Sequence, residues 1–396
     1  MVDKEKLTLM YRDLEVLSFE IDYVKEAITF LEKLKHFDKA PYGINDKDEK
    51  KIQQRLFRFF YARKIAPTRN DCEKIIQATN CRNTFELSFK GHGLSLSNHY
   101  WVRRDNEKLK YSDINFFANK WDDSFGRAVL SKDYEALKTC DLNVPDVVTN
   151  GWGVKGWIYD NGPKLYKLGI DKDQSEEAIC EVLASRLANR LFDEGEALLY
   201  ELKTINGHYA SVSPSILNTD EELFPIINIL PFDLYNIYRE KSINKESGKI
   251  FFQKLRDYNL PEIYKFFIKV SCFRCLGFVS DFHFDNISII RNMKTNEIRP
   301  APLFDFGGAF GSSKFGKSLI SNPNKGVLLL VYFLFNDLDP DWDYSWYNPR
   351  KLEGFEEEIR EYLSKSDFYT PDLIERVIEV YKQQKRSLDE MASAKK

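Results

Sequence analysis

Three polar residues in the C-terminal half of the chain have the types and spacing of a phosphoryl-transfer site. Asn286 follows Asp281 by five residues, and Asp305 begins an Asp-Phe-Gly triplet. A transferred phosphoryl group carries negative charge on its equatorial oxygens, so hard oxygen ligands must hold magnesium close to it. Asn286 and Asp305 are suited to hold that metal, and Asp281 is suited to accept the proton of an attacking hydroxyl. Together the two motifs predict phosphoryl transfer with ATP and Mg²⁺ as cofactors.

The segments around these residues have the patterns of the elements that must position them. Ile263–Leu276 is apolar at helical spacing, Ile287–Ile290 is a short β-branched run, and a second strand is predicted near Ala301–Phe304. We therefore expect the aspartate and the asparagine on a loop between a helix and a β-hairpin.

The first motif reads DxHxxN and the second lies in Ala-Pro-Leu-Phe-Asp305, and in both respects the chain resembles the HipA-like kinases. The resemblance implies a protein-kinase fold in which Asp281 is the catalytic base and Asn286 and Asp305 are magnesium ligands. It implies that His283 braces the loop. It also implies a serine or threonine of a protein as acceptor, and a toxin-type kinase with a small antitoxin-like regulator as a possible setting.

A glycine-rich segment, Thr-Asn-Gly-Trp-Gly-Val-Lys-Gly ending at Gly156, lies upstream where a kinase needs a nucleotide cradle. Gly151 and Gly153 leave backbone N–H groups that phosphates can approach without an intervening side chain. The family resemblance assigns Lys155, at the end of this loop, to nucleotide binding. A tight hairpin turn explains the same glycines almost as well.

A strand lysine and a helix glutamate follow in the order that a kinase requires. In Leu165–Leu168 the side chain of Lys167 points opposite to its apolar neighbours, as expected of the lysine that holds the α- and β-phosphates, with Lys164 as a weaker competitor. Glu181, within the next helix, is the predicted partner of Lys167, and Glu177 is the alternative one turn earlier. That helix is predicted from apolar residues at helical spacing, namely Ile179, Val182, Leu183, Leu187 and Leu191.

Two further strands are predicted at Ala197–Ile205 and Gly207–Val212. The pattern then breaks near Ser211 and Ser213, where a kinase hinge would fall and where backbone groups would bind adenine.

The composition is typical of a globular protein, without a disulfide framework or a membrane-spanning segment. The 396 residues are 43% hydrophobic, and 58 basic residues against 61 acidic ones leave a net charge of −3, so no overall field favours nucleic acid or an anionic membrane. The longest apolar run, Val327–Phe335, is about half of what a spanning helix needs. The six cysteines include a CxxC at Cys272 and Cys275, which we interpret as core packing rather than a metal site. A cytoplasmic protein is the simplest interpretation.

The N-terminal part differs from the rest, because Lys4–Leu34 and Glu49–Ala62 have helical periodicity. Basic residues gather in and after the second segment, and a solvated helix face or a docking surface would explain them: Arg55, Arg58, Arg63 and Arg69. Beyond the Asp-Phe-Gly triplet, Phe355–Leu363 and Pro371–Arg386 are predicted helices of a helical lobe.

We therefore predict an α+β, bilobal protein-kinase-like fold, with a β-rich N-lobe, a helical C-lobe and a mainly helical N-terminal extension. The predicted parts are residues 1–120 for the extension, 121–213 for the N-lobe and 214–396 for the C-lobe. The predicted activity is ATP- and Mg²⁺-dependent phosphorylation of a protein serine or threonine. A lipid or small-molecule kinase and a nucleotide-binding pseudokinase scaffold are the alternatives.

Overall fold

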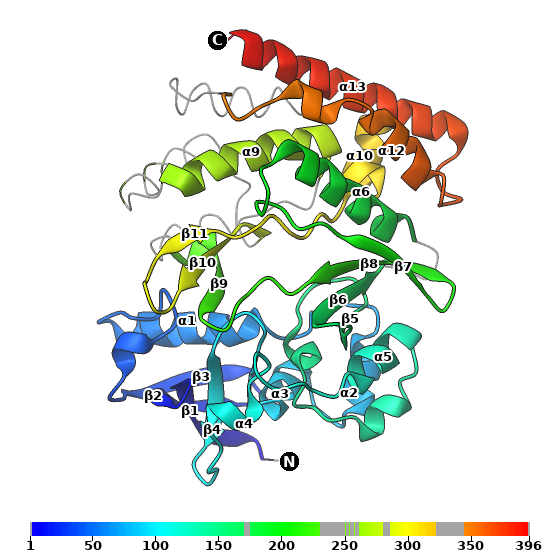
Figure 1. Ribbon diagram of the computed structural model, residues 1–396. Helices are drawn as coiled ribbons and strands as arrows, with labels where there is room; N and C mark the ends of the chain where they lie inside the picture. Colours follow the sequence, from blue (N-terminus) through cyan, green and yellow to red (C-terminus); the bar gives the residue numbers. More distant parts are fainter. Residues whose placement is uncertain are drawn as a thin grey trace. The chain divides into compact units, whose positions relative to one another are not determined.

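The computed structural model describes residues 2–169, 175–229, 250, 253, 257, 261–279, 286–321 and 344–394 (Figure 1). The chain divides into two compact units. Unit 1 comprises Met1–Asp171, Pro214–Phe224 and Arg291–Glu297, and unit 2 comprises Lys172–Ser213, Pro225–Ile290 and Ile298–Lys396. The predicted boundaries at residues 120 and 213 stay predictions.

Unit 1 begins with an antiparallel sheet whose strand order is β3-β2-β1-β4. Its strands are β1 (Lys4–Tyr11), β2 (Leu14–Asp22), β3 (Ala27–Lys33) and β4 (Tyr100–Arg104). A two-residue turn joins β1 to β2, because Tyr11 and Leu14 face each other across the ladder, and Arg12 within the turn has a φ of +50°. Such left-handed turns match the twist of a β-hairpin.

The helical prediction for Lys4–Leu34 is wrong, because this segment forms β1, β2 and β3. Its apolar residues satisfy two periods at once. Leu7, Met10 and Tyr11 have helical spacing, whereas Leu7, Leu9 and Tyr11 alternate as in a strand. The tight turn after Tyr11 ends any helix there, so the N-terminal extension is a sheet with helices and is not mainly helical.

The predicted helix at Glu49–Ala62 is confirmed as α1 (Glu49–Tyr61), which lies beside the sheet in Figure 1. Asp48 caps its N-terminus by accepting a hydrogen bond from the backbone N–H of Lys50. One face of the helix is buried in the core that it shares with the sheet, through Ile52, Leu56 and Phe60.

Three of the four arginines in and after α1 bond to other parts of unit 1 and are not part of a solvated face. Arg55 donates to the carbonyl oxygen of Gly43, and Arg63 donates to that of Gly93 at 3.1 Å. The side chain of Arg69 is 1% exposed and lies in a buried ion pair. These three contacts explain the residues as structural braces.

The rest of unit 1 consists of short elements followed by the β5–β6 hairpin. They are η1 (Phe37–Lys39), α2 (Cys72–Ala78), α3 (Thr84–Lys90), α4 (Tyr111–Ile114), α5 (Ser124–Ser131), η2 (Ala136–Thr139), η3 (Pro145–Val148), β5 (Lys155–Tyr159) and β6 (Pro163–Leu168). Strand β9 (Glu221–Pro225) begins in unit 1.

Unit 2 is mainly helical. Its described residues form the helices α6 (Ser175–Leu191), η4 (Ile226–Ile229), α9 (Pro261–Gly277), η6 (Ala309–Gly311), α10 (Lys314–Ser321), η7 (Pro349–Leu352), α12 (Phe355–Leu363) and α13 (Pro371–Ala394). Its hairpins are built from β7 (Glu201–Ile205), β8 (His208–Pro214), β10 (Ser288–Asn292) and β11 (Ile298–Pro300). The β10–β11 turn belongs to unit 1.

The helical predictions for this unit are confirmed where the structure describes them. The apolar stripe of α6 is buried, α9 contains Ile263–Leu276, and α12 has the predicted bounds. Helix α13 runs on to Ala394, and Val327–Phe335 lies outside the described residues. The strand predicted at Ala301–Phe304 is displaced, because β11 ends at Pro300 and Leu303 makes only an isolated bridge.

Two further observations concern classes of site. Cys272 and Cys275 are free thiols with no exposed surface inside α9, which fits core packing. Across the described ranges, no helix is both long enough and apolar enough to cross a membrane.

Candidate active site

The glycine-rich loop before β5 curls around the ammonium group of its own lysine. Lys155 is 7% exposed, and its Nζ donates to the carbonyl oxygen of Asn150 at 2.9 Å. Gly151 has a φ of +115°, and a Cβ at that position would lie 2.1 Å from Lys155 Nζ. A glycine is therefore required there both by the backbone conformation and by the lysine.

The second lysine of the predicted site lies directly opposite the first one. Lys155 and Lys167 are Cα partners in the antiparallel β5–β6 ladder, so their side chains emerge on the same face. Gly153 lies against the stem of Lys167, because a Cβ there would be 3.8 Å from its Cγ and Cε. Like charges directly opposite each other in a ladder repel, and an anion bound beside them would relieve the repulsion. This arrangement suits a polyphosphate.

Two buried ionisable groups support this loop and were not expected from the sequence. Arg69 forms a two-bond ion pair with Asp71, at 2.6 and 2.9 Å, and also donates to the carbonyl oxygen of Lys155 at 3.3 Å. Asp146, which is 3% exposed, accepts the backbone N–H of Trp157 at 2.8 Å. Burial raises the pKa of Asp146 to about 7. Both groups hold the strand that carries Lys155.

The predicted helix glutamate is buried and hydrogen-bonded in unit 2. Glu181 is 1% exposed, and its Oε2 accepts a hydrogen bond of 2.5 Å from the hydroxyl of Ser211 on β8. Ser211 therefore braces Glu181 with its side chain, while its predicted role in adenine binding, and that of Ser213, stay predictions. Because Lys167 belongs to unit 1 and Glu181 to unit 2, their pairing also stays a prediction.

Both candidate metal ligands lie beyond the same end of the β10–β11 hairpin. Ala301 donates its N–H to the carbonyl oxygen of Ser288 at 2.9 Å, so the backbone just before β10 faces the backbone just after β11. Asn286 precedes that contact on one strand and Asp305 follows it on the other. Amide and carboxylate oxygens are ligands that fit Mg²⁺. Asp281 and His283 lie outside the described residues.

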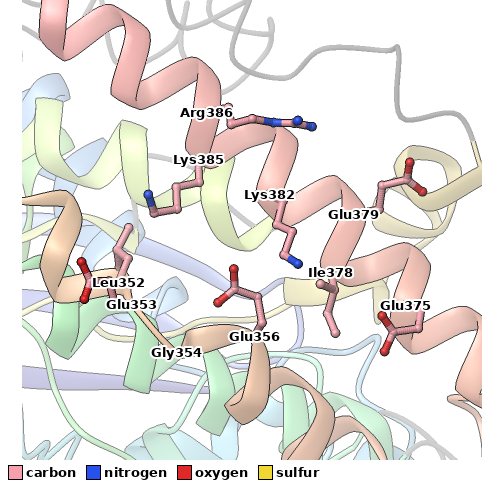
Figure 2. Close-up of a pocket in the computed structure, with 10 residues that line it drawn as sticks. All are labelled: Leu352, Glu353, Gly354, Glu356, Glu375, Ile378, Glu379, Lys382, Lys385 and Arg386. Carbon is pink, nitrogen blue, oxygen red and sulfur yellow. The ribbon is translucent and has the colours of Figure 1, made fainter.

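Two cavities of the described chain contain none of the predicted catalytic, nucleotide-binding or metal-ligating residues. In unit 2, a groove of about 660 Å³ runs between the start of α12 and one side of α13 (Figure 2). Its charged lining residues have both signs, namely Glu353, Glu356, Glu375, Glu379, Lys382, Lys385 and Arg386. In unit 1, a cavity of about 410 Å³ lies beside the β5–β6 turn. Neither lining identifies a ligand chemistry.

The fold is similar to that of a solved toxin–antitoxin protein. The chain superposes on HipA of Shewanella oneidensis MR-1, from the structure of its toxin–antitoxin system with HipB and operator DNA, with a TM-score of 0.52 and 10% sequence identity over 96% of each chain. The chain has a HipA-like fold. This similarity confirms the predicted fold class, except that the N-terminal extension contains a β-sheet and is not mainly helical.

The other comparisons add no further identification. The proinflammatory kinase CtkA of Helicobacter pylori matches with a TM-score of 0.39 and 15% identity, over 59% of this chain and 88% of CtkA. No protein-family model and no curated protein matches the sequence.

Proposed function

We propose that the protein is a kinase that transfers the γ-phosphate of ATP to a serine or threonine hydroxyl of a protein. The observation that carries this proposal is the pair of lysines that face each other beneath the glycine-rich loop, Lys155 and Lys167. The HipA-like kinase fold supports it, and so do the two motifs that contain Asp281 and Asp305.

On this proposal the lysines have different tasks. Lys155 orders the loop through the carbonyl group of Asn150, so that the backbone N–H group of Gly153 can approach phosphate oxygens. The N–H group of Gly151 already donates to Asn150 Oδ1 at 2.7 Å, so Gly151 serves the loop by its backbone conformation. Lys167, half-buried between the buried Tyr166 and Leu168, holds the α- and β-phosphates. Glu181 orients Lys167, and the segment with Ser211 and Ser213 binds adenine.

Asn286 and Asp305 would hold Mg²⁺, which neutralises charge on the β- and γ-phosphates when it is bound. Asp281 accepts the proton of the acceptor hydroxyl, so that the hydroxyl oxygen attacks the γ-phosphorus as ADP leaves. The three residues then act on one reacting group, and loss of any one of them impairs transfer more than folding.

The partner and the cellular setting are also proposals. The solved HipA of Shewanella oneidensis MR-1 is in complex with HipB and operator DNA, and this favours a small antitoxin-like regulator for the present chain. We place the protein in the cytoplasm, acting on a protein substrate and without direct contact to membrane or nucleic acid.

Transfer of labelled γ-phosphate from ATP with Mg²⁺ tests the proposal, using the full chain alone and with a cytosolic extract. We expect label on protein with the wild type and about 100-fold less with Lys167→Met, because removal of one group that stabilises the transition state has effects of that order. Lys164→Met is the matched control. It removes a lysine three positions away on β6, where the side chain emerges on the opposite face, and should keep activity within about threefold.

Asp281→Ala separates binding from chemistry. It should bind ATP as the wild type does and transfer no phosphate, because the base is not a primary nucleotide ligand. If the label appears on lipid or on a small molecule instead of protein, the chain is a lipid kinase or a small-molecule kinase. If the wild type binds ATP but transfers no phosphate, the pseudokinase scaffold is the remaining alternative. Unchanged transfer by Asp281→Ala would refute the assignment of Asp281 as the base.

A further inference from the structure

The first residue of the Asp-Phe-Gly triplet has an unusual backbone conformation. Asp305 has a φ of +59°, in the left-handed region. Residues with a Cβ adopt this region at a cost in free energy, and aspartate does so more readily than most. Such a conformation persists only where neighbouring groups hold it, and it is typical of functional sites.

Tyr200 supplies a hydrogen bond that holds Asp305 in place. The backbone N–H of Asp305 donates to the hydroxyl oxygen of Tyr200 at 3.1 Å. The Tyr200 ring lies edge-on to Phe306, with centroids 5.1 Å apart, and Phe306 lies edge-on to Phe273 at 5.7 Å. All three rings are at least nine-tenths buried. Little space is left for the hydroxyl to move away from the N–H group.

Tyr200 is itself anchored to the helix that carries the predicted glutamate. Its backbone N–H donates to the hydroxyl of Ser185 at 3.0 Å, and that hydroxyl donates to the carbonyl oxygen of Val182 at 2.7 Å. Ser185 lies one turn after Glu181 on α6, and it has no exposed surface. The position of Asp305 is therefore tied to α6 through the backbone and ring of one tyrosine.

The chain on either side of Tyr200 and Asp305 is paired as well. Leu303 donates its N–H to the carbonyl oxygen of Glu196 at 2.8 Å and accepts the N–H of Leu198 at 2.9 Å. These bonds bring the two segments side by side just before Tyr200 and Asp305. The contact between the tyrosine hydroxyl and the aspartate N–H thus lies next to an isolated β-bridge that pairs the two segments.

We propose that Tyr200 is a positioning residue for the metal-binding carboxylate of Asp305. By accepting the N–H of Asp305, its hydroxyl keeps this residue at positive φ and aims the carboxylate. When the hydroxyl is absent, the backbone can relax towards negative φ, and the carboxylate then leaves the direction that suits the metal. This inference rests on the proposed function, because it requires Asp305 to be a Mg²⁺ ligand.

Binding of Mn²⁺, measured by electron paramagnetic resonance with ATP present, tests this role without relying on turnover. Tyr200→Phe keeps the ring against Phe306 and removes only the hydroxyl. We expect Mn²⁺ to bind about threefold to tenfold more weakly, which corresponds to the loss of one buried hydrogen bond. Binding of ATP without metal should stay within about twofold of the wild type.

Tyr369→Phe is the matched control. The hydroxyl of Tyr369, which is 4% exposed, donates to the carbonyl oxygen of Phe310, five residues after Asp305, at 3.0 Å. The variant therefore loses a buried hydrogen bond to the segment that follows Asp305, while the N–H of Asp305 keeps its partner. It should lower the thermal unfolding midpoint and leave Mn²⁺ affinity within about twofold of the wild type. Equal weakening in both tyrosine variants would overturn the positioning role, since it would indicate general loosening.

Asp305→Asn separates failure of the inference from failure of the proposed function. Asparagine also tolerates positive φ but lacks the charge, so this variant should lose ATP-dependent Mn²⁺ binding. If the wild type shows no such binding, the proposed function itself fails. If the wild type binds Mn²⁺, Asp305→Asn does not, and Tyr200→Phe binds as the wild type does, the inference about Tyr200 alone is refuted.

Discussion

Gly151 and Gly162 have the same backbone conformation in different surroundings. Each has a φ of +115°, but a Cβ on Gly151 would meet the ammonium of Lys155, whereas a Cβ on Gly162 would meet nothing within 4 Å. Comparing the two positions therefore separates the free-energy cost of backbone strain, which both share, from the effect of displacing the Lys155 side chain, which concerns Gly151 alone.

We expect Gly151→Ala and Gly162→Ala to lower stability by similar amounts, about 1–3 kcal/mol, because both place a Cβ at an unfavourable φ. Only Gly151→Ala should weaken ATP binding, by about fivefold or more, since it moves the Lys155 side chain from the carbonyl oxygen of Asn150. Calorimetric titration with ATP and Mg²⁺ measures the difference. Equal ATP affinity in the two variants would show that Lys155 does not organise the loop.

The residues of the site divide into those that the sequence could reveal and those that it could not. The strand placement of Lys167 and the helix placement of Glu181 follow from local periodicity, and both are confirmed. The contacts of Arg69 with Lys155 and of Tyr200 with Asp305 join positions 86 and 105 residues apart. No local pattern contains information about such pairs, so the supporting residues could be found only in the fold.

At the level of elements, α6 is held to α12 by a charged cluster. Glu358 of α12 accepts hydrogen bonds from both Arg186 and Arg190 of α6, and its side chain is 12% exposed. Arg190 also donates to the carbonyl oxygen of Glu353 at 2.7 Å. Since α6 carries Glu181, this cluster contributes to the placement of the site.

Glu358→Gln should lower the stability of unit 2 by about 1–2 kcal/mol, because two partly buried guanidinium groups lose their common carboxylate. Glu375→Gln is the control, because the side chains of its ion pair with Arg360 are 58% and 44% exposed, so that solvent screens the pair and its loss should change stability much less. Thermal unfolding midpoints of the two variants give the comparison. An equal decrease would mean that the α6–α12 cluster behaves as a surface ion pair.

A helix or strand could be predicted where its apolar residues fit the helical period of 3.6 residues or the strand period of two residues, but not both. Helices α12 and α13 have a 3.6-residue period that no strand pattern matches, and their bounds were predicted except at the C-terminal end of α13. The first 33 residues fit both periods, and their outcome depends on the turn at Arg12 and on burial beneath α1. Tertiary packing decides such a segment.

At the scale of the whole molecule, Asp146 makes stability depend on pH. Burial raises its pKa to about 7 in the folded protein, against about 3.9 in an unfolded chain. The folded state therefore binds more protons than the unfolded state between these values. The contribution to stability is fully present below about pH 4 and is lost as the pH rises through 7. Among the described residues, Asp146 Oδ2 has no hydrogen-bond partner to offset ionisation.

Asp146→Asn removes this ionisation while its Oδ1 can still accept the N–H of Trp157. The free energies of unfolding of the variant and the wild type should be closer near pH 5 than at pH 8. At pH 8 we expect the variant to be more stable by up to about 3 kcal/mol. Thermal unfolding at both pH values measures the change, and comparison with the wild type cancels the titration of all other groups. If the difference between the two proteins is the same at pH 5 and pH 8, Asp146 is already ionised in the folded state. In that case the hydrogen bond from the Trp157 N–H to Asp146, which holds the strand of Lys155, is made to a charged carboxylate, and its contribution to stability does not change between pH 5 and pH 8.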